Sequence, residues 1–180
     1  MFNQTIERVK GVLRLQTSAF EEIEQSRSAT LGALLVVVVV AIAAAIGGLG
    51  DDGSNGVLSA VSGAVVSWIV FSALCYVIGT RFLASPETKA TWGELLRVLG
   101  FAEAPNVLAI VAFIPLFGGL VAAIGSIWAL LAAILGIKQA LEIPYPRAAI
   151  VAVVAWVARL VLLFTIALIF GVTALVFRMF

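Results

Sequence analysis

The sequence predicts an all-α, polytopic membrane protein, and three observations lead to that fold class. First, 63% of the 180 residues are hydrophobic and 12% are charged, whereas a soluble domain is about 45–50% apolar and about 25% charged. Second, five apolar stretches are each long enough to cross a hydrocarbon core about 30 Å thick as a helix. Third, the basic residues gather in connections that would face one side of a membrane.

The five predicted spans cover residues 29–49, 57–80, 98–116, 120–141 and 148–177. The valine run at 36–40 would favour a strand in water, but in lipid the backbone must satisfy its own hydrogen bonds, so we expect a helix. Pro144 and Pro146 separate the last two spans, because proline ends one helix and can begin the next. The chain thus divides into an N-terminal segment, residues 1–28, and a five-helix membrane domain, residues 29–180.

The N-terminal segment predicts an amphipathic helix. Its apolar residues recur at helical spacing and would share one face, and they are Phe2, Ile6, Val9, Leu13, Phe20 and Ile23. Two interpretations remain open: the helix lies on the cytoplasmic leaflet, or it packs on the protein's own loops.

A second amphipathic helix is expected at residues 91–104, before the third span. Thr91 and Glu94 match a capping box, and Trp92 suits the level of the lipid headgroups. We expect this helix to skim the interface and to bend into the third span at Pro105, which removes one backbone donor.

The distribution of Lys and Arg predicts a cytoplasmic N-terminus. Nine basic residues then lie inside, while Asp51, Asp52 and Arg178 lie outside and Arg159 lies within a span. The C-terminus is therefore expected outside, as an odd number of spans requires. The nine are Arg8, Lys10, Arg14, Arg27, Arg81, Lys89, Arg97, Lys138 and Arg147.

The composition removes several classes of function. A net charge of +1 gives no sign of nucleic-acid binding, and the absence of histidine removes histidine-based catalytic and zinc sites. The single cysteine, Cys75, excludes an intrachain disulfide and cysteine-cluster metal sites, and we expect it to be a small buried apolar residue. No nucleophile–base set is evident, so we expect no enzymatic activity, no metal and no cofactor.

Four stretches resemble those of one known family. They are AFEEIEQSRSATLGALLVVV, WGELLRVLGFAEAPNVLAI, IWALLAAILGIKQALEI and RAAIVAVVAW. From about Ala19 to about Trp156 the sequence is similar to the Yip family of five-span membrane proteins. For eukaryotic members the resemblance implies binding of Rab-type GTPases and a role in ER–Golgi traffic. Their cytoplasmic N-terminal regions are much longer, so this chain looks like the prokaryotic branch, in a plasma membrane.

Glu103 and Arg159 are the two charges that hydropathy places at membrane depth. A charge at the bilayer centre costs roughly 2.5–3.5 kcal/mol on insertion scales. We hypothesise an ion pair between them, with Asn106 adding a hydrogen bond between helices. In the alternative, residues 160–177 span alone and Arg159 lies at the cytoplasmic interface. The pair could hold helices together or mark a pathway.

Small residues at four-residue spacing predict close helix packing, either in the monomer core or at an oligomer interface. They are Ser59, Gly63 and Ser67 in the second span, and Gly119, Ala123, Gly125 and Ala129 in the fourth.

We therefore expect a non-enzymatic interaction or membrane-organising subunit. Its partners would be the lipid bilayer and another membrane or peripheral protein. The alternative is a small transporter or channel component with a polar path through Glu103, Asn106 and Arg159. A water-accessible cavity that reaches Glu103 and Arg159 would favour transport. The predicted cytoplasmic contact face consists of Arg8, Lys10, Arg14, Arg81, Lys89, Trp92 and Arg97.

Overall fold

The computed structural model describes residues 2–48, 56–84 and 88–179, and side chains in residues 2–48, 56–84 and 88–169. Every regular element in these ranges is a helix, which confirms the all-α prediction. The elements are α1 (Phe2–Leu13), α2 (Thr17–Gln25), α3 (Ala29–Gly47), α4 (Val57–Arg81), α5 (Trp92–Ala102), the 3₁₀ helix η1 (Ala104–Val111), α6 (Gly118–Leu141) and α7 (Tyr145–Met179). Asp51 and Asp52, predicted to lie on the outer side of the membrane, fall outside the described residues, as does the side chain of Arg178.

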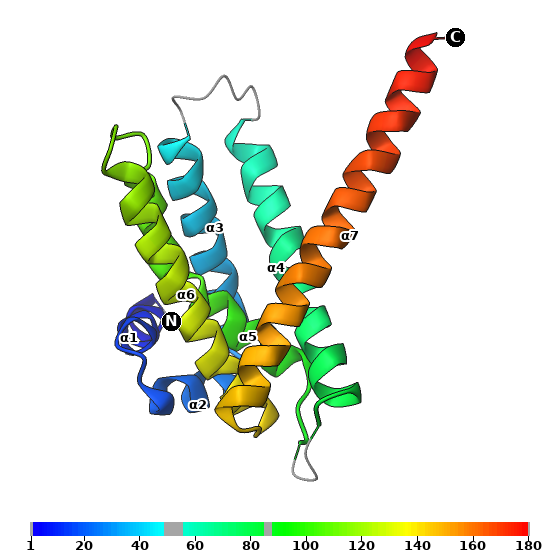
Figure 1. Ribbon diagram of the computed structural model, residues 1–180. Helices are drawn as coiled ribbons and strands as arrows, with labels where there is room; N and C mark the ends of the chain where they lie inside the picture. The colour runs from blue at the N-terminus through cyan, green and yellow to red at the C-terminus, as the bar shows by residue number, and fades with distance from the viewer. Residues whose placement is uncertain (1, 49–55, 85–87, 180) are drawn as a thin grey trace.

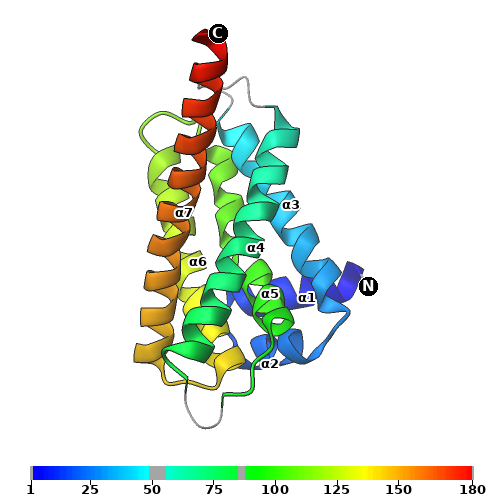
Figure 2. The same cartoon turned by 90° about the vertical axis from the view of Figure 1, so that its right-hand side faces the viewer.

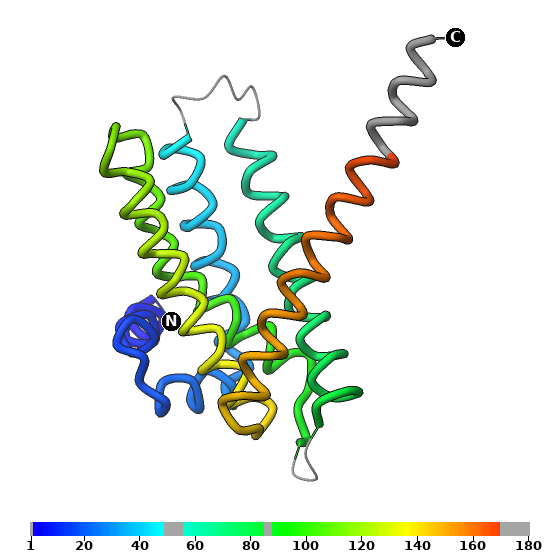
Figure 3. The backbone as a smooth tube through the Cα atoms, viewed as in Figure 1, coloured from blue at the N-terminus to red at the C-terminus, as the bar shows by residue number. Residues whose placement is uncertain are grey.

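The helices form an up-and-down bundle with α1 and α2 near one end (Figure 1), which we call the N-terminal end. From there α3 leads away, α4 returns, α5 and η1 lead away again, α6 returns and α7 leads away, as the tube in Figure 3 shows. The chain therefore begins near the N-terminal end and finishes at the opposite end. Toward its own C-terminus α7 leans away from the other helices.

Four helices in the described ranges are long and apolar enough to cross a membrane: α3, α4, α6 and α7 as far as Ile169. Their outward positions carry large apolar side chains such as Val39, Ile127 and Val153, each about half exposed. Such surface is stable only if hydrocarbon covers it, because a soluble monomer rarely exposes apolar patches of more than a few hundred Å². The prediction of a polytopic membrane protein is confirmed at this level.

The predicted third span, residues 98–116, does not form a single α-helix. There α5 ends at Ala102 and the eight-residue 3₁₀ helix η1 follows, with Pro105 in its first turn. Proline has no N–H to donate and its ring clashes with the preceding turn, so the α-helical hydrogen-bond ladder stops. The two short helices nonetheless run along the bundle between α3 and α6, which both contact η1.

The helix α5 begins as the sequence predicts, but it does not lie where the sequence predicts. The Thr91 amide donates to Glu94 Oε2 at 2.7 Å and the Glu94 amide to Thr91 Oγ1 at 3.4 Å, so the predicted capping box forms. Instead of skimming a surface, α5 packs against α2, α3, α4 and α6. Leu95, Val98 and Phe101 are fully buried, because apolar residues occupy several faces of this helix.

The N-terminal segment forms two helices rather than one. They are separated near Leu15, whose positive φ of 54° reverses the chain direction. In Figure 2, α1 runs across the direction of α3. Phe20 and Ile23 of α2 are fully buried beneath the bundle, so α2 closes its N-terminal end.

The predicted small-residue rows divide into two groups. Gly125 and Ala129 of α6 are buried, and the backbone of η1 approaches Gly125 closely. Methyl groups at Gly63 and Gly119 would meet no described atom within 4 Å. The exposed members of the rows are Ser59, Gly63, Gly119 and Ala123, while Ser67 is half-buried. In the fourth span, therefore, only Gly125 and Ala129 of this row pack in the core of the monomer.

Gly125→Ala should destabilise the fold. The added Cβ would lie 2.8 Å from the Pro105 carbonyl oxygen and 3.2 Å from Leu108 Cβ, and overpacking of this kind costs about 1–3 kcal/mol. Gly63→Ala, in the exposed interior of α4, is the control and should gain up to about 1 kcal/mol from helix propensity. Thermal unfolding in detergent measures both. Equal effects at the two sites would contradict the packing of η1 on α6.

Candidate functional site

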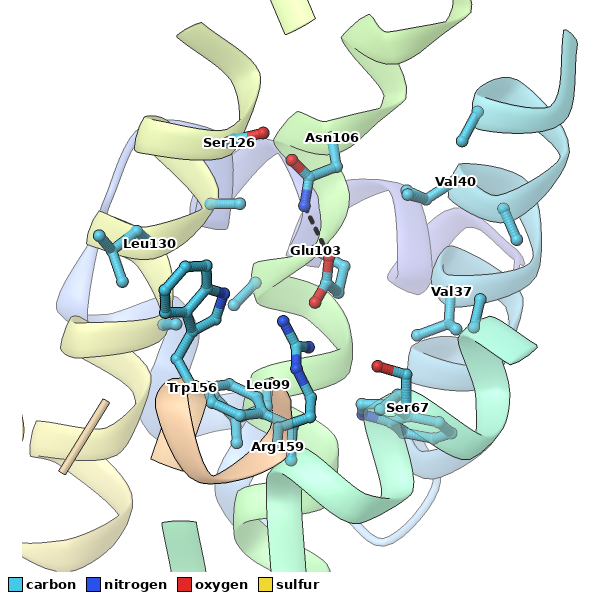
Figure 4. Close-up of a pocket in the computed structure, with 18 of the residues that line it drawn as sticks. Val37, Val40, Ser67, Leu99, Glu103, Asn106, Ser126, Leu130, Trp156 and Arg159 are labelled. Atoms are coloured by element: carbon cyan, nitrogen blue, oxygen red, sulfur yellow. Dashed lines mark hydrogen bonds between the residues drawn. The ribbon is translucent and has the colours of Figure 1, made fainter. Parts of the chain in front are cut away.

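A cavity of about 640 Å³ lies between α3, α4, α6, α7 and the α5–η1 segment (Figure 4). We call it the central cavity. Its wall is mostly aliphatic and aromatic, with Phe71, Leu99 and Trp156 among its larger side chains. The polar side chains that reach it are Ser67, Glu103, Asn106, Ser126 and Arg159.

Glu103 and Asn106 enter the cavity at the break between α5 and η1. Glu103 is the residue that ends α5 and precedes η1, so its carboxylate lies where the α-helical ladder stops. Asn106 Nδ2 donates a 2.6 Å hydrogen bond to Glu103 Oε2, drawn as the dashed line in Figure 4. The three-residue spacing places both side chains on one side of the chain. Asn106 therefore bonds locally and does not join two helices.

Arg159 enters the cavity from α7. Its guanidinium carbon lies 5.0 Å from the centroid of the Phe71 ring, within the range of a cation–π contact. In Figure 4 the guanidinium points toward Glu103. Among the described side chains, the ion pairs within 4.0 Å are Arg8–Glu22 and Lys10–Glu7. Glu103 and Arg159 therefore share one cavity without forming a direct ion pair.

The central cavity has a closed floor toward the N-terminal end. Below its wall lie Cys75, Val98, Ile137 and Val151, each fully buried. They belong to one continuous core cluster that joins α4, α5, α6 and α7. Cys75 is the small buried residue that the sequence predicts.

The opposite side of the cavity is open where α7 leaves the bundle. Beyond Arg159, Leu160, Val161 and Phe164 are 44%, 60% and 71% exposed, and α7 diverges from α4 and α6 there (Figure 1). Trp156, one turn before Arg159, is 47% exposed at this opening. The cavity is thus closed by core side chains toward the N-terminal end and open to the surroundings of the bundle near Trp156.

Phe71 and Trp156 are cavity residues that the sequence analysis missed. Trp156 could have been found, because it precedes Arg159 by three residues and shares its helix face. The partner of Arg159, Phe71 on α4, depends on how α4 and α7 pack, which no local pattern reveals.

Two members of the predicted contact face are buried instead. Arg8 is 6% exposed; its Nε donates to Glu22 Oε1 at 3.2 Å and its Nη2 to Ser26 Oγ at 2.9 Å. Arg97 is 8% exposed and donates to the carbonyl oxygens of Ile23 and Glu24. These carbonyls lie in the last turn of α2, where a cation suits both the unpaired acceptors and the helix dipole.

The other predicted members of the face remain on the surface. Lys10 forms an exposed 2.7 Å ion pair with Glu7, and Trp92 is 43% exposed. Arg14, Arg81 and Lys89 are also exposed. Among the described residues, no three acidic or thiol groups gather so that they could hold a metal ion.

Glu24 carries an unusual carboxyl group at the N-terminal end. Its pKa is raised from the ordinary value of 4.5 to about 7, first by burial and then by the nearby negative charges of Glu94 and Glu142, while the positive charge of Arg97 lowers it. Near neutral pH this carboxyl group is therefore close to half protonated.

The fold and composition define a helical integral membrane protein, with a charged pocket between apolar helices. The model of the Yip1 domain family matches residues 10–175. This match covers most of the chain, so the chain belongs to the Yip1 domain family and the resemblance seen in its sequence is confirmed. No curated protein and no solved structure matches the chain.

Stability should fall as the pH rises from about 5 to 7. The folded protein keeps the Glu24 proton up to about pH 7, whereas the unfolded chain releases it near 4.5. The folded state thus binds more protons in this window, so deprotonation opposes folding. Thermal unfolding should occur at a higher temperature at pH 5.5 than at pH 8.

Glu24→Gln should flatten this pH dependence and raise the unfolding temperature at pH 8. Glu7→Gln, at an exposed position of α1, should preserve the wild-type dependence. The chain has no histidine that could titrate in the same window. A wild-type profile that rises with pH would contradict the assignment.

Proposed function

We propose that this Yip1 domain protein is a non-enzymatic membrane protein that organises the membrane, or a membrane complex, from its N-terminal end. The observation that carries the proposal is the position of α1. This helix runs across the bundle direction beside α3 (Figure 2) and contacts α3, α5 and η1. Family membership points the same way, since it indicates a membrane protein rather than an enzyme.

The two faces of α1 differ in what they contact. Thr5, Arg8 and Val12 are buried against the protein, whereas Phe2 and Ile6 are 71% and 37% exposed. A helix that lies in the plane of an interface buries such an apolar face among the lipid headgroups and acyl chains. The exposed basic residues Lys10, on α1, and Arg14, directly after it, suit anionic lipid headgroups. We infer that α1 both packs on the bundle and inserts into one leaflet.

We further propose that the N-terminal end faces the cytoplasm and that the α5–η1 segment completes a fifth pass. The support is the distribution of charge: the connections at the N-terminal end carry most of the Lys and Arg residues, as the positive-inside rule requires. The packing of η1 between α3 and α6 shields its irregular backbone from lipid, and non-helical backbone is tolerated at membrane depth under that condition.

Transport is the second candidate, and the central cavity favours it, because Glu103 and Arg159 both reach this space. The closed floor argues against a continuous path, since fully buried side chains from four helices fill the bundle below the cavity. A pocket that is closed toward the N-terminal end suits binding better than conduction. We therefore place the membrane-organising role first.

The membrane-organising role predicts an effect on vesicle shape. Reconstituted wild-type protein should produce smaller or tubular vesicles in electron cryomicroscopy, because a helix inserted into one leaflet expands that leaflet alone. The double variant Phe2→Glu/Ile6→Glu should lose this effect while thermal unfolding shows that it is folded. The matched control Asn3→Glu/Gln4→Glu places the same charges at exposed polar positions of α1 and should retain it. Equal vesicle shapes with wild-type protein and the first variant would refute this role for α1.

The proposed topology predicts which sites a membrane-impermeant maleimide reaches in intact cells. With Cys75 replaced by Ala, a cysteine at Gly119, where α6 begins, should react from outside. A cysteine at Ser18, exposed on α2, should react only after the cells are permeabilised. Reaction of both positions in intact cells, or of Ser18→Cys alone, would rule out this orientation or the fifth pass.

A further inference from the structure

We propose that the central cavity is a binding site for the headgroup of a phospholipid that carries a primary ammonium, such as phosphatidylethanolamine. In this site Arg159 binds the phosphate and Glu103 binds the ammonium. The inference concerns the bundle interior and is independent of the role proposed for α1.

The first argument is that the two charged side chains share the cavity without pairing with each other. Glu103 and Arg159 face the same cavity, yet no ion pair within 4.0 Å joins them among the described side chains. The contacts that the structure shows for them are neutral groups, the Asn106 amide and the Phe71 ring. Charges inside a membrane protein almost always pair with one another, with backbone carbonyls or with water. Two opposite charges held apart therefore suit a ligand that offers both complementary charges.

The second argument is chemical selectivity. Guanidinium binds phosphate through parallel N–H···O hydrogen bonds, and a primary ammonium offers three donors to a carboxylate. A choline headgroup has no N–H to donate. A purely anionic headgroup lacks the ammonium, and the carboxylate of Glu103 would repel it. A zwitterionic headgroup with a primary ammonium satisfies both residues at once.

The third argument is the shape and lining of the site. Its volume of about 640 Å³ lies within the usual range of ligand pockets, about 300–1,000 Å³. The polar side chains form a small group in an otherwise apolar wall, as expected for the polar head of an amphiphile. The entrance opens beside exposed apolar side chains of α7, including Leu160 and Phe164. Acyl chains attached to a bound headgroup can therefore remain in the bilayer.

The test is native mass spectrometry of the full chain in detergent, after delipidation and addition of defined lipids. Wild-type protein should retain phosphatidylethanolamine about tenfold or more in preference to phosphatidylcholine and phosphatidylglycerol, since one charge-assisted hydrogen bond contributes about that factor. Soluble phosphoethanolamine should compete only weakly because it lacks acyl chains. Thermal unfolding of wild-type protein gives a second readout, and phosphatidylethanolamine should raise the unfolding temperature more than phosphatidylcholine does.

The variants separate the two halves of the site. Arg159→Gln should lose retention of all three lipids. Glu103→Gln should keep the phosphate contact and lose the preference for phosphatidylethanolamine over phosphatidylcholine. Arg147→Gln, at an exposed position of α7, and Glu7→Gln, on α1, are matched controls and should behave as wild type.

Several results would overturn the proposal. They are equal retention of the three lipids by wild-type protein, unchanged lipid retention in Arg159→Gln, and tight binding of soluble phosphoethanolamine without a lipid preference. A second copy of the chain that fills the cavity, seen as a dimer that excludes lipid, would also overturn it. Because the first and third of these results and the thermal shift use only wild-type protein, a variant that fails to fold leaves the test intact. Phe2→Glu/Ile6→Glu should bind lipid normally in this assay, so its failure in the vesicle experiment would be a separate result.

Discussion

The interruption of the α-helix between α5 and η1 is the constraint on which the rest of the bundle depends. Pro105 cannot donate a hydrogen bond, so the α-helix that begins at Trp92 stops at Ala102 and continues as a 3₁₀ helix. Non-helical backbone of this kind is stable at membrane depth only when protein surrounds it, and here α3 and α6 pack on both sides of η1. The same break places Glu103 and Asn106 in the central cavity. One proline therefore shapes both the path of the third segment and the polar part of the candidate site.

The N-terminal end is held together by arginines that act within the protein. Arg97 binds the last carbonyls of α2 and Arg8 binds Glu22 and Ser26, so two buried cations fasten the N-terminal helices beneath the bundle. Positive charge near the cytoplasmic side of a membrane protein is commonly attributed to topology alone. In this chain two of the basic residues at the N-terminal end are structural, whereas Lys10, Arg14, Arg81 and Lys89 are among those that face the surroundings.

The two candidate roles use different parts of one molecule. The N-terminal helices offer a surface to lipid or to a partner, while the central cavity offers a charged pocket in the bundle. Membership of the Yip1 domain family is consistent with both. A bound phospholipid would link them, because the same bilayer would supply the ligand of the cavity and the environment of α1.

The sequence by itself determined that this protein lies in a membrane, that it is helical, and approximately where four long helices begin and end. Those features follow from local composition, since about twenty apolar residues in lipid must satisfy their backbone groups as a helix. The capping box at Thr91 and the burial of Cys75 were also accessible, because each depends on near neighbours or residue type. The family could be inferred from four stretches of the sequence that resemble those of Yip family members.

Only the tertiary structure decided the surroundings of α5, the burial of Arg8 and Arg97, and the separation of Glu103 from Arg159. A hydropathy profile assigns depth to a charge but does not show what lies opposite it. Whether Arg159 meets a carboxylate, a ring or a cavity depends on how α7 is placed against α4 and α6. That placement is set by side-chain packing between segments more than eighty residues apart, such as Phe71 and Arg159.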